Sequence, residues 1–133
     1  MENLPIIFGL VSGILMLLAH FKASSPFPDG SVVDGFEGPK LRGHVEIDGL
    51  YRFVTCYVTE QQLAFKGHFP SIGLILNINE LNLEHKKAFI GTQIRVTSSD
   101  MYVNHMFSEI VLSHSFARKI DKLSNGKFGY STV

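Results

Sequence analysis

The chain has 133 residues, and its twelve basic and twelve acidic side chains give a formal net charge of zero. This length suits one ordinary domain, and balanced charge without a block of like residues argues against a nucleic-acid-binding protein. Cys56 is the only cysteine, which excludes an intrachain disulfide, and we expect its thiol to be a small buried apolar filler. Charged residues make up 18% of the chain, against roughly 25% in soluble domains, which indicates a surface with non-aqueous neighbours.

A long apolar segment occupies the amino terminus. Residues 4–21 read LPIIFGLVSGILMLLAHF and carry no charge. As an α-helix they would span about 27 Å, close to the hydrocarbon thickness of a bilayer. The segment is apolar all round, and Pro5 falls in the first turn, where a helix tolerates proline. We therefore expect residues 1–21 to form a single transmembrane helix.

Two alternatives stay open for this segment. A cleaved signal peptide would have a basic leader and small residues before the cleavage site, whereas here Glu2 stands in the leader and Phe21 and Ala23 form a poor processing pair. The other alternative is a buried core strand or helix, although strands usually run about five or six residues. The uncleaved anchor is the interpretation that the sequence favours.

Small residues mark one face of the apolar segment. Gly9 and Gly13 form a small-xxx-small pair with Ser12 beside them, and such residues let another helix backbone approach closely in lipid. We interpret Gly9, Ser12 and Gly13 as a helix-docking face. The alternative is that glycine is simply frequent in membrane helices.

The flanking charges predict an orientation for the anchor. No Lys or Arg precedes the segment, whereas Lys22, Lys40 and Arg42 follow it. Under the positive-inside rule the carboxyl-terminal domain then lies on the cytoplasmic, matrix or stromal face.

The remaining chain predicts a linker followed by a β domain. Residues 22–34 contain serines, two prolines and an Asp-Gly pair, a composition that favours an extended passage and a turn. Residues 35–133 alternate glycines with short runs of β-branched and aromatic residues, as in antiparallel β proteins. We expect a small mainly-β domain, either a sandwich or a barrel-like sheet.

Alternation of apolar and polar residues predicts individual strands. Leu50–Thr59 is apolar on both faces, as in a central strand or one covered by a partner, and Leu74–Ile78 is another strand. Ile90–Thr97 is the clearest, because Ile90, Ile94 and Val96 share one face.

The last third of the chain allows two interpretations. Asn125-Gly126 predicts a two-residue hairpin turn between residues 120–124 and 127–131. Residues 100–122 fit either a strand over Ile110–His114 or a helix capped by Asp100. We favour the strand and expect at most one short helix in the domain.

The segment Lys66-Gly67-His68-Phe69-Pro70 resembles the histidine motif of hotdog-fold hydroxyacyl thioester dehydratases. The resemblance covers about fifteen residues and implies a general base at His68. Where that family has Pro-Gly and then a helical acid, this chain has Leu76-Asn77 and Asn82. We therefore interpret His68 as a turn residue and keep it only as a weak catalytic candidate.

A second segment, residues 36–43 with the sequence FEGPKLRG, resembles a family of small β-barrel proteins of uncharacterised function, and residues 89–92 are similar to a later segment of that family. This resemblance implies a β-barrel and no activity.

The sequence predicts neither a cofactor nor a metal site. The six histidines lack i, i+4 spacing and Cys/His clustering, and no phosphate-binding loop or nucleophile elbow is present.

The anchor and the charge-poor domain favour a non-catalytic accessory subunit of a membrane complex of the respiratory, ATP-synthase or photosynthetic type. Its expected partners are larger membrane subunits and lipid. The alternative is a membrane-tethered hotdog-like enzyme or ligand-binding β-barrel for acyl or other small apolar substrates, with His68 and His44 or His105 in the site.

Overall fold

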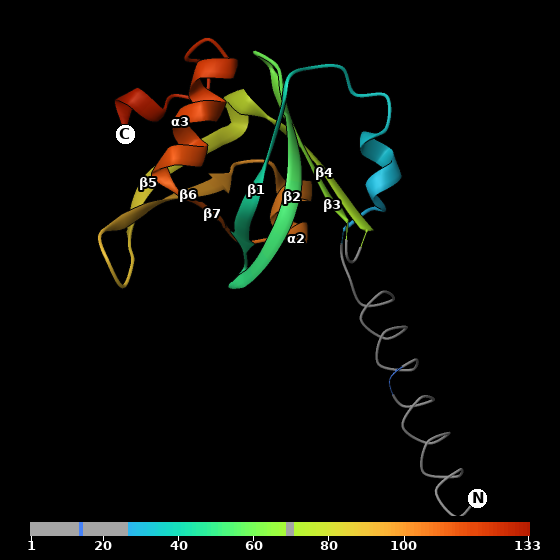
Figure 1. The fold of residues 1–133 in the computed structure, drawn as a ribbon, viewed down its shortest axis with the longest axis horizontal. Helices are drawn as coiled ribbons and strands as arrows, with labels where there is room; N and C mark the ends of the chain where they lie inside the picture. Colours follow the sequence, from blue (N-terminus) through green and yellow to red (C-terminus); the bar gives the residue numbers. More distant parts are fainter. Residues whose placement is uncertain (1–13, 15–26, 69–70) are drawn as a thin grey trace, which may run out of the picture.

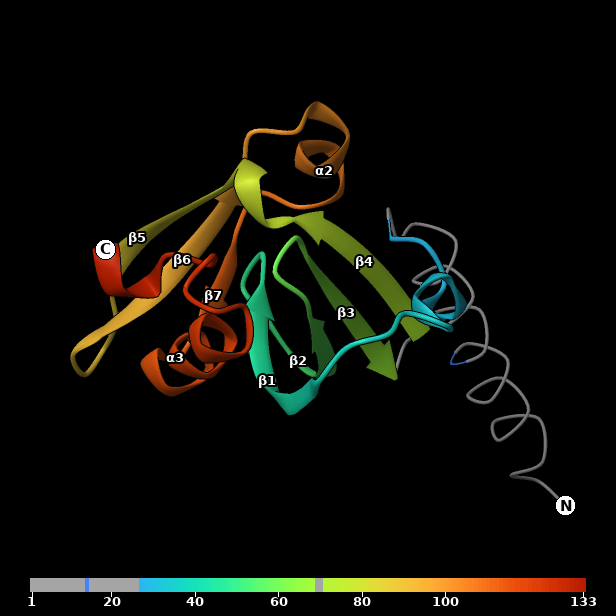
Figure 2. The same cartoon turned by 90° about the horizontal axis from the view of Figure 1, so that it is seen from above.

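The computed structural model describes residue 14, residues 27–68 and residues 71–133. These residues form a small mainly-β domain, in which seven strands make one curled antiparallel sheet with the shape of a half-barrel (Figures 1 and 2). The strand order is β4-β3-β2-β1-β7-β6-β5. The mainly-β prediction is confirmed, and the sheet has the barrel-like form rather than that of a sandwich.

The elements follow one another along the chain with short connections. They are η1 (Gly30–Val33), β1 (Lys40–Ile47), β2 (Leu50–Val58), β3 (Gln62–His68), β4 (Ser71–Asn77), η2 (Ile78–Glu80), β5 (Leu81–Lys87), β6 (Thr92–Ser98), α2 (Met101–Met106), β7 (Ile110–Leu112), α3 (His114–Leu123) and η3 (Tyr130–Thr132).

The predicted transmembrane helix over residues 1–21 lies outside the described residues, except for Ile14, and so do the docking residues Gly9, Ser12 and Gly13. In the described ranges no helix combines the length and the apolar character needed to cross a bilayer.

The described part of the expected linker packs against the sheet. Its 3-10 helix η1 begins after Asp29, whose carboxylate accepts a hydrogen bond from the Ser31 N–H at 2.9 Å. Val33 is buried, with 2% of its surface exposed. Gly73 on β4 makes this approach possible, since a Cβ there would lie 2.5 Å from Val32. Residues 29–33 therefore cover part of the outer face of β4.

The core lies on the concave face of the half-barrel. β6 shows the pattern: Ile94 and Val96 are buried, whereas Gln93, Arg95 and Thr97 are half-exposed. The apolar face of α3 packs on the same core through Phe116, Ala117 and Ile120. Burial of these side chains is the main stabilising term of such a domain.

Three predicted strands are present with small shifts. The strand expected over residues 50–59 is β2, which lies between β1 and β3 in the sheet as expected of a central strand. The strand expected over residues 74–78 is β4, which ends at Asn77 because Ile78 begins η2.

The strand expected over residues 90–97 is β6, but the prediction was wrong at its first residues. Lys87 and Thr92 form the last pair of the β5–β6 hairpin, and Ile90 lies in the loop with 86% of its surface exposed.

The prediction of a hairpin at Asn125-Gly126 was wrong. These residues end α3 with φ values of 54° and 79°, and the Gly126 N–H donates to the Asp121 carbonyl at 2.8 Å. A two-residue hairpin turn and a helix carboxyl terminus both require left-handed backbone, and Asn and Gly satisfy either. The dipeptide alone does not distinguish the two.

The prediction of at most one short helix was also wrong, because residues 100–124 contain α2, β7 and α3. Asp100 does cap a helix, as its carboxylate accepts from the N–H groups of Tyr102 and Val103. The expected strand over 110–114 ends at Leu112, because Ser113 caps α3 by accepting from the Phe116 N–H at 3.1 Å.

The β1–β2 turn contacts the segment that leads into β7, and it thereby links the half of the sheet formed by β1–β4 to the half formed by β5–β7. Asp48 and Gly49 have φ values of 50° and 86°, as a two-residue hairpin turn requires. The Asp48 carboxylate accepts from the N–H groups of Ser108 and Glu109 at 2.8 and 3.0 Å. This side chain therefore fixes the segment that leads into β7.

We expect Asp48→Ala to lower the free energy of unfolding by about 1–3 kcal/mol, because alanine neither accepts the two hydrogen bonds nor readily adopts positive φ. Asp48→Asn keeps an oxygen acceptor and should cost less. Asp48→Gly adopts positive φ without strain but has no acceptor. Its loss of stability therefore reports the two hydrogen bonds alone. Urea unfolding measures all three, and an equal loss for Asn and Ala would contradict the role of the acceptor.

Candidate functional site

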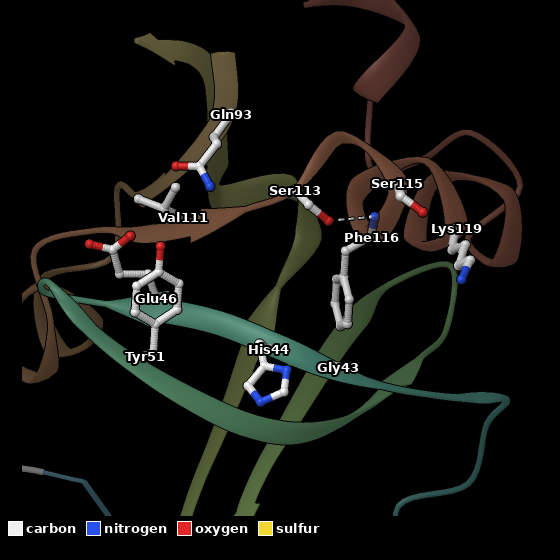
Figure 3. A pocket seen from close by; sticks show the side chains of 10 residues that line it. All are labelled: Gly43, His44, Glu46, Tyr51, Gln93, Val111, Ser113, Ser115, Phe116 and Lys119. Carbon is white, nitrogen blue, oxygen red and sulfur yellow. Dashed lines mark hydrogen bonds between the residues drawn. The ribbon is translucent and has the colours of Figure 1, made fainter. Parts of the chain in front are cut away.

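A hollow of about 370 Å³ lies between β1 and α3 (Figure 3). It exists because β7 is short: β1 pairs with β7 only at Glu46↔Val111 and Ile47↔Ile110. The first half of β1 therefore has no strand beside it on this side. α3 covers the gap, with the Phe116 ring so close to Gly43 that a Cβ on this glycine would lie 2.8 Å from it.

Polar side chains from three directions surround this hollow. Figure 3 shows His44 and Glu46 of β1 on one side, Gln93 of β6 on another, and Ser115 and Lys119 of α3 on the third. His44, Ser115 and Lys119 are exposed. The hollow thus offers both charge signs and several hydrogen-bonding groups to a small polar ligand, but water competes for the exposed ones.

His44 itself packs on the outer face of the sheet. Its ring lies 5.1 Å from that of Phe53, the residue opposite it on β2, in an edge-to-face arrangement. Such pairs stabilise neighbouring strands by about 0.5–1.5 kcal/mol beyond their buried area. This contact fixes the ring at the rim of the hollow.

His68, the weak catalytic candidate, does not line this hollow. It is the last residue of β3, and its Nε2 shares a hydrogen bond of 3.1 Å with the Thr55 hydroxyl on β2. β2 separates β3 from β1, so the strands that carry His68 and His44 are about 10 Å apart. His105 lies on α2, so the structure does not bring the three histidines of the enzyme alternative together.

A group of hydrogen-bonded side chains that the sequence did not predict surrounds His114. Its Nε2 lies 2.9 Å from the Thr92 hydroxyl and its Nδ1 lies 3.0 Å from the Tyr130 hydroxyl. The His85 ring is 5.7 Å from the His114 ring, centroid to centroid. Because hydroxyls engage both ring nitrogens, His114 connects the first residue of β6, next to the β5–β6 loop, to α3 and η3. A single histidine without a motif gives no sequence signal for such hydrogen bonds.

Cys56 is fully buried in the core. Burial without a nearby cation raises the pKa of its thiol well above the ordinary value, so the thiolate that a nucleophile needs does not form. The prediction of a buried apolar filler is confirmed.

Ion pairs cross the outer face of β5, β6 and the segment before β7. The Glu109 carboxylate lies 2.5 Å from both Lys86 Nζ and Arg95 Nε, and Arg95 also reaches Glu84 at 3.2 Å. The hydrogen bond from Lys86 is the main cause that lowers the pKa of Glu109, and Arg95 adds to it. Among the described residues no group of three or more His, Cys, Asp and Glu side chains could hold a metal ion.

Comparisons of the chain with protein-family models, with curated proteins and with solved structures find no match. The local resemblances at residues 36–43 and 66–70 therefore do not extend to a family assignment.

The lowered pKa of Glu109 predicts an acid-sensitive contribution to stability. A carboxyl whose pKa is lower in the folded chain stabilises the fold above its unfolded pKa of about 4.3 and loses this effect as the pH falls through the folded value. We expect Glu109→Gln to lower the free energy of unfolding at neutral pH. Below about pH 4 the free energies of unfolding of the variant and the parent should approach each other. Urea unfolding across pH measures this, with the exposed Glu37→Gln as control. A difference that is constant with pH would contradict the prediction.

Proposed function

We propose that the protein is a non-catalytic accessory subunit of a multi-subunit membrane complex of the respiratory, ATP-synthase or photosynthetic type. The observation that carries the proposal is the uncharged segment Leu4–Phe21, long enough for a bilayer-spanning helix. In this proposal the Gly9 and Gly13 face packs against a larger membrane subunit, and the β domain lies on the positive-inside face.

The surface of the β domain supports the same proposal. Next to the β1–β2 turn, Leu50, Tyr51 and Phe53 are 59%, 72% and 50% exposed. Large aromatic side chains are enriched where proteins meet. A partner that covers this surface would bury apolar area without any chemical step.

The docking face gives the first test. In native membranes extracted with mild detergent, we expect the full chain to migrate with a large complex on native gels. Gly9→Leu combined with Gly13→Leu should abolish this migration, because leucine keeps the helix apart from its neighbour. Val11→Leu combined with Ile14→Leu is the matched control, since it keeps the segment apolar and both glycines. A parent chain that migrates alone would contradict the proposal.

A second candidate function is a membrane-tethered β-barrel that binds or converts acyl or other small apolar compounds. The observation that favours it is the hollow between β1 and α3, whose volume of about 370 Å³ lies within the usual range for small-molecule sites. Its lining includes Val111 and Phe116 beside the polar groups.

An assay with hydroxyacyl thioesters separates the two functions. We expect no turnover by the purified chain, because the Thr55 hydroxyl engages His68 and no acidic side chain is bonded to this histidine in the described part of the chain. Turnover that disappears with His44→Ala, at the hollow, or with His68→Ala, and that persists with His105→Ala, would favour the enzyme and contradict the accessory subunit.

A further inference from the structure

The tip of the β5–β6 hairpin presents two large apolar side chains to solvent. Phe89 is 102% exposed and Ile90 is 86% exposed, the highest fractions among the exposed large hydrophobic residues of the described chain. The loop contains residues 88–91, and the Ala88 N–H donates to the Gly91 carbonyl at 3.0 Å. Gly91 has a φ of 73°, which closes the loop tightly. Neither side chain reaches the core.

Apolar side chains at this position have no explanation within the fold. Hairpin loops favour Gly, Asn, Asp and Ser, which suit the backbone and water. Single exposed apolar residues are ordinary, but adjacent large ones on a projecting tip indicate an external contact.

We propose that this hairpin tip is a membrane contact, in which Phe89 and Ile90 enter the interfacial layer of a lipid bilayer. The proposal goes beyond the accessory-subunit function and holds whether or not residues 4–21 span the membrane. An apolar tip that enters the headgroup and acyl boundary buries its area in a fluid surface, which needs no matching groove.

Charge around the tip suits anionic headgroups. Residues 86–92 carry two lysines and no acid. Lys86 is paired with Glu109, whereas Lys87 is exposed. The exposed Arg118 lies on α3, whose first residue, His114, meets the hydroxyl of Thr92 beside the loop at 2.9 Å. Basic groups behind an apolar tip are the arrangement that interfacial segments use on anionic membranes.

A lipid surface fits this tip better than a protein partner does. Stable protein interfaces bury about 800 Å² on each side, far more than a convex tip of two side chains offers. Figure 1 shows the β1–β2 turn at the same end of the domain as the β5–β6 tip. There Leu50 and Tyr51 are 59% and 72% exposed. Leu50 and Tyr51, which the accessory-subunit proposal places against a membrane subunit, therefore face the same bilayer as the β5–β6 tip.

The chain contains no Trp, so Phe89→Trp gives a fluorophore at the tip. We expect its emission to shift to the blue when the full chain is reconstituted in vesicles of phosphatidylcholine and phosphatidylglycerol. Phosphatidylcholine brominated near the headgroup end of its acyl chains should remove most of this emission. Ile90→Trp should behave in the same way, because both residues occupy the tip.

Tyr102→Trp is the matched control. Tyr102 is 82% exposed on α2, which Figure 2 shows well away from the hairpin tip. Its emission should stay accessible to aqueous iodide and insensitive to the brominated lipid. Thermal unfolding by circular dichroism checks that all three variants fold.

Two outcomes would overturn the proposal. The indoles of the Phe89→Trp and Ile90→Trp variants could both remain accessible to iodide and unaffected by bromine, which would place the tip in water. Alternatively, their emission could shift to the blue without quenching by brominated lipid, which would mean that protein covers the tip. Neither outcome depends on migration with a large complex, so this test is independent of the one for the accessory subunit.

Discussion

Everything in this domain depends on a junction of two residue pairs between β1 and β7. On its other side β1 pairs with β2 along its whole length, but β7 meets β1 only at Glu46↔Val111 and Ile47↔Ile110. So short a ladder cannot set the angle between two half-sheets alone. The Asp48 carboxylate reinforces it by accepting from Ser108 and Glu109, and Glu109 in turn holds Lys86 of β5 and Arg95 of β6. These polar contacts extend the junction across the outer face.

The short junction also determines where a ligand or partner can approach. Because β7 stops at Leu112, Ser113 is free to cap α3, and the helix then lies over the unpaired half of β1. The hollow that results is lined by exposed polar groups such as His44 and Lys119. Exposed groups stay hydrated, whereas the strong electrostatic interactions of a catalytic site require that water be excluded. These exposed groups are available for contact with a ligand or a partner at the surface.

The sequence predicts those elements of the fold that neighbouring residues determine, and it misses those that depend on contacts distant in the chain. β2 and β6 follow from alternation, because one face of each strand is buried whatever lies beyond it. Asn125-Gly126 was misread because a helix end and a hairpin need the same backbone. Of the site, His44 was named from the sequence, but Lys119 was not, because α3 meets β1 only through tertiary packing. His114 had no local signal either, since its partners are distant in the chain.

Ile90 lies in a loop where the sequence pattern predicts a buried strand, and this difference carries functional information. Alternation places it with Ile94 and Val96 on a buried face, yet the hairpin closes at Lys87↔Thr92 and leaves it in the loop. The sequence therefore has a core-type residue where the fold has no core, beside Phe89, which is more exposed still. Places where local patterning and the fold disagree are often functional. An apolar pair that folding does not require is explained if a non-aqueous surface outside the domain receives it.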